Sequence, residues 1–534
     1  MSLVDLVIKL AGHIPVVGTD VNRIAINYFA GSTTPRPRPY SLWSAVQETD
    51  PTLPEYVTDY TSWPSLTNRG YSARHLPPAD PKYIAVLPQD APYSGKPGSP
   101  VGDVTSLFVR NGRMTTSRSS LLFMFFAQWF TDSVLRINPV DRRKNTSNHD
   151  IDLCQIYSLT EECARLLRKN DGSGHLRCQK IKGEDYPEYL CQEGQGGVTV
   201  KPEFNALRAS GNLTADQVVD AFLAPDFTNR KGKLYATGLE RGNSTIGYVA
   251  ISTIFMREHN RIADVLRKNN PNWSDERLFQ TARNINIVLL MKLVVEDYIN
   301  HILGHPLFKL DPNFAEDENW CRPNWIAIEF DLLYRWHGLA PDQITVHGKT
   351  VPAKEFRTNN GLLEDVGIGA VIDAASRQRA GKIGLANTPD YLWAAEWQSI
   401  KMGRDFRLRP YNEYRAHFGL ETLADFSDLT SDAALQEKLK KLYTNIDNLE
   451  LFVGLFAEEA DDGALFGDLL NHMVAYDAFT QIFSNPLLSQ RVYGAATFTD
   501  YGLELIERTT SIEDLVNRNV ATPVRASLSV LPAV

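Results

Sequence analysis

Three segments of the chain place polar side chains among apolar neighbours, where such groups are costly to bury unless they are paired. In FFAQWFTDSVL, Gln128 and Asp132 are four residues apart, so on a helix they share one face. In EFDLLYRWHGLAPD, Tyr334 and His337 are three residues apart and also fit one helix face. In LERGNSTIGY, Arg241 lies in a glycine-flanked turn, from which an arginine can reach into a cavity. These residues are the candidates for chemistry.

Each of these segments also has a plain structural explanation. A single histidine on an apolar helix is more often a satisfied core residue than a ligand. Gln128 and Asp132 could be surface or capping groups, and Tyr334 could be a core tyrosine with a hydrogen-bonded hydroxyl. The string REHNR, at 257–261, could be only a buried salt-bridge cluster. Spacing alone therefore indicates a large α-helical protein with an unknown site.

Composition narrows the class of protein. The 534 residues are 43% hydrophobic and 22% charged, which excludes disorder, collagen and coiled coil as descriptions of the whole chain. A net charge of −9 disfavours nucleic-acid binding. No apolar run approaches the ~18 to 20 residues that span a bilayer. Five scattered cysteines without CxxC spacing favour a reducing compartment over a disulfide framework or a zinc site.

The elements that must position the candidate residues are mostly helices. Residues 119–136 are apolar almost all round, which predicts a buried helix. A long helix is predicted from about 243 to the stop at Pro271, and Ser274 then caps a second helix that ends at Gly304. Strand-like alternation is rare and short. Further helices are expected at 324–335, 361–377, 388–401, 432–444 and 463–482.

An ordered series of motifs resembles the animal-type haem peroxidases, within them the cyclooxygenase and fatty-acid dioxygenase branch. It runs through TIFMREHNRIADVL, DERLFQTARNI, VEDYI, EFDLLYRWHGLAPD, IDAASRQRAGKIG, LRPYNEYRAHFG, LYTNIDNLELFVGL and NPLLSQRVYGAATF to ERTTSIEDLVNRN. REHNR alone would be a weak signal, but the series at compatible spacing is specific.

The resemblance implies a mostly α fold with one large helical catalytic domain at 119–525. An irregular wrapping segment at 35–118 and amphipathic helices at 1–34 would precede this domain. A short tail at 526–534 would follow it.

The resemblance also implies roles around the haem. His337 matches the proximal ligand of the iron, for which neutral imidazole is a suitable donor. Trp336 and Asp331 would be cofactor-binding residues in the same motif. Tyr334 matches the tyrosine whose radical takes a hydrogen atom from an unsaturated fatty acid, after which O2 adds to the carbon radical.

On the distal side of the haem, the resemblance implies roles for Gln128 and for Arg241, which matches the distal arginine of the peroxidase branch. Position 132 departs from the family, because Asp132 stands where a distal histidine is expected. A carboxylate can transfer the same protons if its pKa suits the site. We expect non-covalent haem b, since Thr131 and Ser244 replace the carboxylates that esterify haem in the mammalian peroxidases. We expect no calcium, since Ser133 replaces a calcium ligand.

The substrate channel is less well defined. Ser511 and Tyr298 match channel positions, and His305 stands where the family has a tyrosine at the channel mouth. The arginine that pairs the fatty-acid carboxylate should fall near Phe29, yet Arg23 is the nearest one. The carboxylate-binding residue therefore stays open.

The N-terminal residues 2–30 hold two short apolar segments separated by Gly18. They could pack on the body as helices or lie in a membrane interface, and the resemblance favours the second arrangement. Asp5 and Lys9 make a poor secretory signal, so we expect a cytoplasmic protein attached peripherally to a membrane surface.

Taken with the resemblance, these features predict a haem-dependent fatty-acid dioxygenase that yields a hydroperoxide or an endoperoxide. Its partners would be an unsaturated fatty acid, O2 and a peroxide, with no nucleic acid. A homodimer is the assembly that family members often form. Two alternatives stay open: a peroxidase of small reductants in which Tyr334 is structural, and a haem-binding sensor or lipid carrier without turnover.

Overall fold

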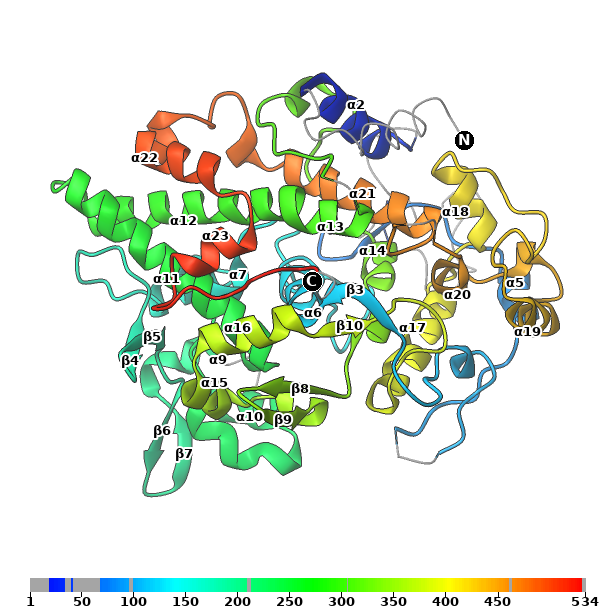
Figure 1. Cartoon of the computed structure of the whole chain (residues 1–534), viewed down its shortest axis with the longest axis horizontal. Coiled ribbons are helices and arrows are strands. Elements are labelled where there is room, and N and C mark those ends of the chain that lie inside the picture. Colours follow the sequence, from blue (N-terminus) through cyan, green and yellow to red (C-terminus); the bar gives the residue numbers. More distant parts are fainter. Residues whose placement is uncertain are drawn as a thin grey trace, which may run out of the picture.

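Two long helices, α11 (Ile246–Asn269) and α12 (Asp275–Leu293), pack side by side in the body of the protein (Figure 1). The computed structural model describes residues 19–33, 40–41, 68–95, 99–208, 213–304, 306–460 and 463–530. The Ser274 hydroxyl accepts from the Arg277 amide and caps α12, as predicted. The α12 helix continues through the π-helical turn η6 (Val294–Ile299) and α13 (Asn300–Leu303) to Gly304.

The helical stretch Asp275–Leu303 is long and apolar enough to cross a membrane by length and composition alone. The sequence had not indicated an apolar run of this length. Its apolar window is 83% buried inside the protein, which is typical of a core helix.

The predicted apolar helix is α6 (Leu121–Thr131), and nearly all of its side chains are buried. Trp129 stacks on Phe255 of α11 with ring centroids 4.7 Å apart, and its indole N–H donates to the Ser252 hydroxyl at 2.9 Å. A Cβ at Gly247 would lie 2.0 Å from the ring of Phe125. Glycine at this position therefore allows α6 and α11 to approach closely.

The remaining predicted helices are present with shifted ends. The single helix expected over 361–377 is wrong, because Gly367 has a φ of +90° and splits it in two. The helices that surround the core are α14 (Ile328–Leu333), α15 (Asn360–Val366), α16 (Ile368–Arg377), α17 (Trp393–Asp405), α18 (Tyr411–His417), α19 (Ala433–Tyr443), α20 (Leu451–Ala457), α21 (Asp468–Phe483), α22 (Ala495–Arg508) and α23 (Ile512–Asn517).

Strands in the described part of the chain form only two-stranded antiparallel sheets. The pairs are β1 (Tyr40–Ser41) with β2 (Ala73–Arg74), β3 (Thr116–Ser120) with β10 (Arg379–Gly381), β4 (Cys178–Ile181) with β5 (Glu184–Pro187), β6 (Cys191–Gly194) with β7 (Gly197–Val200), and β8 (Gln343–Val346) with β9 (Lys349–Pro352). The described C-terminal residues run along β3, where the Ser120 amide donates to the Leu528 carbonyl at 2.9 Å. A mostly α fold is confirmed.

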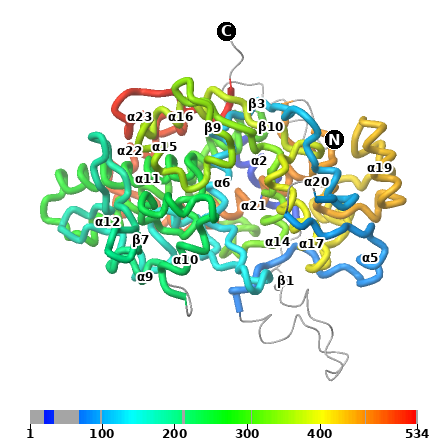
Figure 2. The backbone as a smooth tube through the Cα atoms, turned by 90° about the horizontal axis from the view of Figure 1, so that it is seen from below, coloured from blue at the N-terminus to red at the C-terminus, as the bar shows by residue number. Residues whose placement is uncertain are grey.

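The N-terminal helix α2 (Thr19–Ala30) lies against α21 (Figures 1 and 2). Ala25, Ile26 and Phe29 are buried in this contact, and the Phe29 ring lies 6.3 Å from Phe479 of α21. The second predicted N-terminal segment thus uses its apolar face to pack on the body. The first segment lies outside the described residues.

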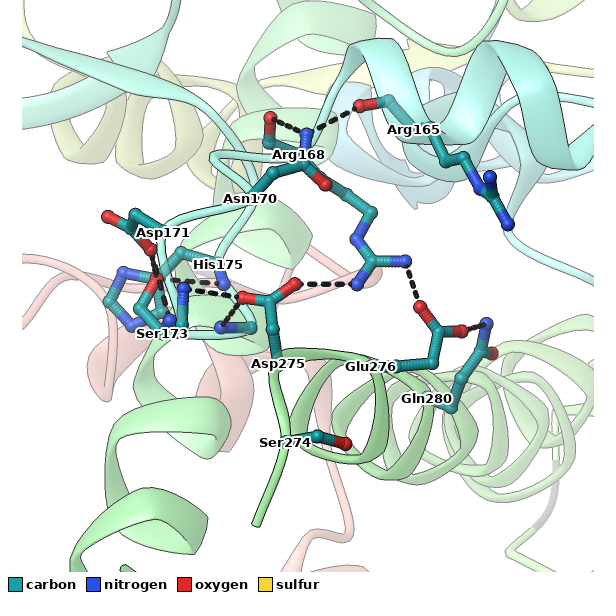
Figure 3. Close-up of polar contacts among 12 residues, drawn as sticks. Arg165, Arg168, Asn170, Asp171, Ser173, His175, Ser274, Asp275, Glu276 and Gln280 are labelled. Carbon is teal, nitrogen blue, oxygen red and sulfur yellow. Dashed lines mark hydrogen bonds and ion pairs between the residues drawn. The ribbon is translucent and has the colours of Figure 1, made fainter. Parts of the chain in front are cut away.

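A loop at 168–176 is fastened to the start of α12 (Figure 3). The Arg168 guanidinium donates to Asp275 at 2.7 Å and to Glu276 at 2.6 Å, and it lies 4.0 Å above the ring of Phe279. The second Asp275 oxygen accepts from the amide of Gly174 at 2.8 Å. These contacts fix the first turn of the central helix.

The REHNR string is a buried structural network. Glu258 is fully buried and accepts hydrogen bonds from Arg261, Arg518 and Asn519. His259 lies between the Tyr157 hydroxyl and a backbone carbonyl, and burial lowers its pKa to about 3. The structural explanation of this string is therefore the correct one.

Candidate active site

The segment that carries Tyr334 and His337 follows α14 directly. The helix ends at Leu333, and His337 begins a separate 3₁₀ turn, η8 (His337–Leu339). The prediction that Tyr334 and His337 share one helix face is therefore wrong. The turn that follows is packed tightly against the segment leading from β10, since a Cβ at Gly338 would lie 2.6 Å from the Lys382 carbonyl.

A stack of aromatic rings holds this segment to α6. The Tyr334 and Trp336 rings stack with centroids 4.5 Å apart. Trp336 is also parallel to Phe123 of α6 at 6.0 Å, and Phe123 stacks on Tyr298 of η6 at 5.2 Å. The structure thus brings together three of the predicted residues, Tyr334, Trp336 and Tyr298, around one apolar wall.

The phenol of Tyr334 is held in an unusual state for a buried tyrosine. Its hydroxyl and that of Tyr298 are buried and lie beside each other, and neither completes a well-formed hydrogen bond within the described residues. Burial raises the pKa of both phenols above the ordinary value. Tyr334 is therefore a neutral phenol in a largely apolar environment.

His337 presents its two ring nitrogens differently. Nδ1 lies 3.1 Å from Oε1 of the buried Glu396 in α17, whereas Nε2 is engaged by no hydrogen bond or ion pair in the described part of the chain. Nε2 is therefore available as a ligand atom. Asp331 is buried beside this segment and forms an ion pair with Arg335. Its predicted cofactor-binding role stays a prediction.

The acid–base candidates meet where α6 ends. Asp132 is the C-cap of α6 with helical backbone angles, so it stacks one turn beyond Gln128 as predicted. Arg241, in the turn η5 (Glu240–Asn243), places Nη1 3.6 Å from Asp132 Oδ1. The Arg241 side chain is 49% exposed and that of Asp132 only 12%. Gln128 accepts from the hydroxyl of Thr245, the N-cap of α11, at 3.1 Å.

The environment of Asp132 tunes its acidity. Burial raises the pKa of this carboxyl to about 6, against the opposing effects of the Arg241 and Arg136 guanidinium groups. The positive charge of Arg136 is balanced by Glu240, which accepts two hydrogen bonds from the guanidinium at 2.9 and 3.0 Å. A carboxyl that titrates near pH 6 can both accept and return a proton near neutral pH.

These two groups of residues include buried polar atoms that have no hydrogen-bond partner in the described part of the chain. They include the indole nitrogen of Trp336 and the hydroxyl of Ser244. Unpaired buried polar atoms are uncommon in folded proteins and call for an explanation. An imidazole with a free Nε2, an aromatic wall and an acid–base pair form a donor set that fits haem.

Comparison with known proteins agrees with this geometry. The family model for animal haem peroxidase matches residues 138–529. The chain belongs to this family. Prostaglandin G/H synthase 1 of Rattus norvegicus is 32% identical over 495 residues, which cover 88% of the chain and 75% of that protein. Prostaglandin G/H synthase 2 of Gallus gallus is 31% identical over 480 residues, covering 88% and 74%.

Solved structures share the fold of this family member. The fatty acid alpha-dioxygenase of Oryza sativa superposes with a TM-score of 0.70 at 16% identity, over 100% of this chain and 98% of that one. Peroxidase A from Dictyostelium discoideum gives a TM-score of 0.64 at 18% identity, over 93% and 99%. The predicted family and fold class are confirmed. The protein is an oxidoreductase, and its family implies a haem cofactor.

Of the predicted channel residues, Ser511 is not joined to this site and His305 cannot be placed. The Ser511 hydroxyl caps α23 by accepting from the Asp514 amide at 3.2 Å, and no contact in the described residues links it to Tyr334. His305 lies outside the described residues. The channel roles of both stay predictions.

Two residues at the site were not predicted from the sequence. Glu396 contacts His337, and the buried Tyr248 hydroxyl lies near Asp132. Glu396 carried a usable signal, because it is a lone carboxylate between apolar residues in a predicted helix. The same signal identified Asp132.

Proposed function

We propose that this protein is a haem-dependent fatty-acid dioxygenase in which Tyr334 carries the oxidising radical. The observation that supports this most strongly is the Tyr334 phenol, whose hydroxyl is buried beside that of Tyr298, whose ring stacks on Trp336, and which lies three residues from His337. The names of the relatives, prostaglandin G/H synthases and fatty acid alpha-dioxygenases, agree with a fatty-acid substrate.

His337 would hold the haem iron through Nε2. When bound, haem supplies the chemistry that draws an oxidising equivalent from a peroxide and removes one electron from Tyr334. Attachment would be non-covalent, because Thr131 and Ser244 carry hydroxyls where esterification needs carboxylates. Thr131 and Ser133 donate their hydroxyls to carbonyls of their own helix, which supports neither an ester nor a calcium site.

Asp132 would move the proton on the distal side. Its carboxylate would accept a proton from one oxygen of the peroxide. It would return this proton to the other oxygen as the O–O bond breaks. The Arg241 guanidinium beside it stabilises the negative charge that develops as the O–O bond breaks. Gln128, one turn before Asp132, would orient the peroxide by hydrogen bonding.

Tyr334 would then act on the lipid. Loss of one electron and the phenolic proton leaves a tyrosyl radical, which takes a hydrogen atom from a bis-allylic or α-methylene carbon and becomes a phenol again. O2 adds to the carbon radical, and the resulting peroxyl radical recovers a hydrogen atom from Tyr334. The sum is RH + O2 → ROOH, and the radical is regenerated. Closure of the peroxyl radical onto a double bond would give an endoperoxide instead.

Oxygen uptake tests this proposal. Haem-loaded protein with a trace of peroxide should consume O2 when given linoleate or arachidonate, and Tyr334→Phe should abolish uptake while keeping the haem spectrum. Tyr391→Phe, which alters an exposed tyrosine, is the matched control and should retain activity. Palmitate, which is saturated and has no bis-allylic carbon, is tested in parallel. Oxygen uptake with palmitate would place the hydrogen abstraction beside the carboxylate. Uptake that survives Tyr334→Phe would refute the assignment.

A second candidate function is peroxidase activity on small reductants. The observation that favours it is the exposure of Gln128 and Arg241, which leaves the distal side accessible to small molecules. Peroxide-driven oxidation of phenols that is unaffected by Tyr334→Phe, without lipid oxygenation, would support it. Haem loading with no spectral response to peroxide would point to a non-catalytic haem protein. Membrane attachment and a homodimer stay predictions.

A further inference from the structure

A buried carboxylate stands directly behind the proximal histidine. Glu396 lies in α17 and is only 1% exposed. Its Oε1 lies 3.1 Å from His337 Nδ1, close enough for a hydrogen bond, although the ring must turn slightly to complete it. The same oxygen accepts from the Thr388 hydroxyl at 2.6 Å.

We propose that Glu396 is a positioning residue for the proximal ligand: it accepts the Nδ1 proton of His337, presents Nε2 to the haem iron and gives the imidazole anionic character. This inference rests on the haem site of the proposed function and adds a residue that sets the electronic state of the iron.

The surroundings of Glu396 indicate that its negative charge interacts mainly with His337. In the described part of the chain, His337 is the only side chain that forms an ion pair with it. The second oxygen, Oε2, is buried and has no hydrogen-bond partner. A buried carboxylate without a compensating charge is strongly unfavourable. The imidazole N–H of His337 would supply that compensation, and an iron bound at Nε2 would add positive charge to it.

Thr388 fixes the direction of the carboxylate. The Thr388 backbone is tied to the segment around η2 (Thr105–Leu107), since its amide donates to the Phe108 carbonyl at 2.8 Å and its carbonyl accepts from Arg110 at 2.9 Å. The threonine hydroxyl therefore holds Glu396 Oε1 from a rigid position. A carboxylate held in this way cannot swing away from His337.

The contact selects one tautomer of the imidazole. A proton on Nδ1 that is shared with Glu396 leaves the lone pair on Nε2, which is the arrangement that metal-binding histidines adopt when a carboxylate lies behind them. A carboxylate attracts this proton more strongly than a neutral amide or carbonyl does. The imidazole therefore becomes a stronger electron donor.

A stronger axial donor favours ferric over ferrous iron. The protein would keep its iron ferric under reducing conditions, which is the state that reacts with peroxide. Glu396 thus acts through His337 and contacts neither substrate nor peroxide.

The test compares haem-loaded wild type, Glu396→Gln and Glu396→Asp, in the absence of lipid. Two readouts are measured: the Fe(III)/Fe(II) midpoint potential and the iron–histidine stretching band of the ferrous protein in resonance Raman spectra. Glu396→Gln should shift the redox equilibrium at least tenfold toward ferrous iron, about 59 mV for one electron. It should also move the stretching band to lower frequency. The shorter Glu396→Asp should shift both readouts in the same direction by less.

Glu329→Gln is the matched control, because Glu329 is equally buried and accepts from Tyr414, and it should leave both readouts unchanged. If Glu396→Gln fails to fold, Glu396→Asp decides the question. An unchanged potential and band in the folded variant would overturn the inference. Both readouts are independent of lipid oxygenation, so a protein that shows the shift but consumes no O2 would refute the proposed function alone.

Discussion

Asp132→Asn should make the haem-free protein more stable while it disables the peroxide reaction. Burial raises the pKa of Asp132 from an ordinary value near 3.8 to about 6, so the folded protein holds this proton more tightly than the unfolded chain does. Stability is therefore lost as the pH rises from about 4 to about 6. Asparagine, which resembles the protonated carboxyl in shape, avoids that loss.

The magnitude follows from the size of the shift. The rise of the Asp132 pKa from 3.8 to about 6 corresponds, at about 1.36 kcal/mol per pKa unit, to a loss of ~3 kcal/mol in the free energy of unfolding at pH 7. At pH 5 the loss is about half of that. The free energy of unfolding of Asp132→Asn should exceed that of wild type by amounts of this order. The same variant should slow the reaction of the haem-loaded protein with peroxide by about 10²- to 10⁴-fold.

The assay is urea unfolding of haem-free wild type and Asp132→Asn at pH 5 and pH 7, followed by circular dichroism. Glu240→Gln is the matched control on the neighbouring turn. Burial acts to raise the pKa of Glu240, but Arg136 outweighs it and lowers that pKa. Glu240→Gln should therefore destabilise the protein at pH 7. An Asp132→Asn protein that is less stable at pH 7, or whose advantage does not shrink at pH 5, would refute the reasoning.

Other predictions concern the same site and the 168–176 loop that is fastened to the start of α12. The rate of the peroxide reaction should rise with pH through about 6, as Asp132 loses its proton and becomes able to accept one, in stopped-flow measurements on the haem-loaded protein. Arg168→Met should lower the free energy of unfolding by about 2 kcal/mol, because it removes a buried cation from the half-buried Asp275 and the exposed Glu276, whereas the exposed Arg165→Met should change it by less than about 0.5 kcal/mol. Gly174→Ala should lower the melting temperature more than Gly172→Ala does. Both glycines have a positive φ, where an alanine is strained by about 1 kcal/mol, but only the Cβ at position 174 would lie 2.7 Å from a neighbouring side chain. Equal melting temperatures for the two glycine variants would contradict the packing argument.

Local signals determined what could be predicted of the fold. Pro271 and Gly304 mark helix ends through their backbone conformation and Ser274 through its side-chain hydroxyl, and the two long helices start and stop beside them. The break at Gly367 was missed because a glycine inside an apolar helical pattern is tolerated as often as it interrupts.

The site was only partly predictable for a different reason. The residue types at Tyr334, His337 and Asp132 were identified from the sequence. The end of α14 at Leu333 and the tight packing of Gly338 against the segment leading from β10 were not, because that segment is distant in the sequence. Glu396 is far along the chain from His337, and no local pattern could show that the two meet. Pairings of this kind depend on tertiary packing.

Electron paramagnetic resonance can show directly whether a radical on Tyr334 takes hydrogen from the fatty acid. Haem-loaded protein is mixed with peroxide without O2, frozen within seconds, and compared with a sample to which linoleate is added before freezing. We expect a tyrosyl signal that linoleate converts into a carbon-centred fatty-acid radical, and no carbon-centred radical in Tyr334→Phe. A fatty-acid radical that still forms in Tyr334→Phe, or a tyrosyl signal that linoleate leaves unchanged, would contradict this mechanism.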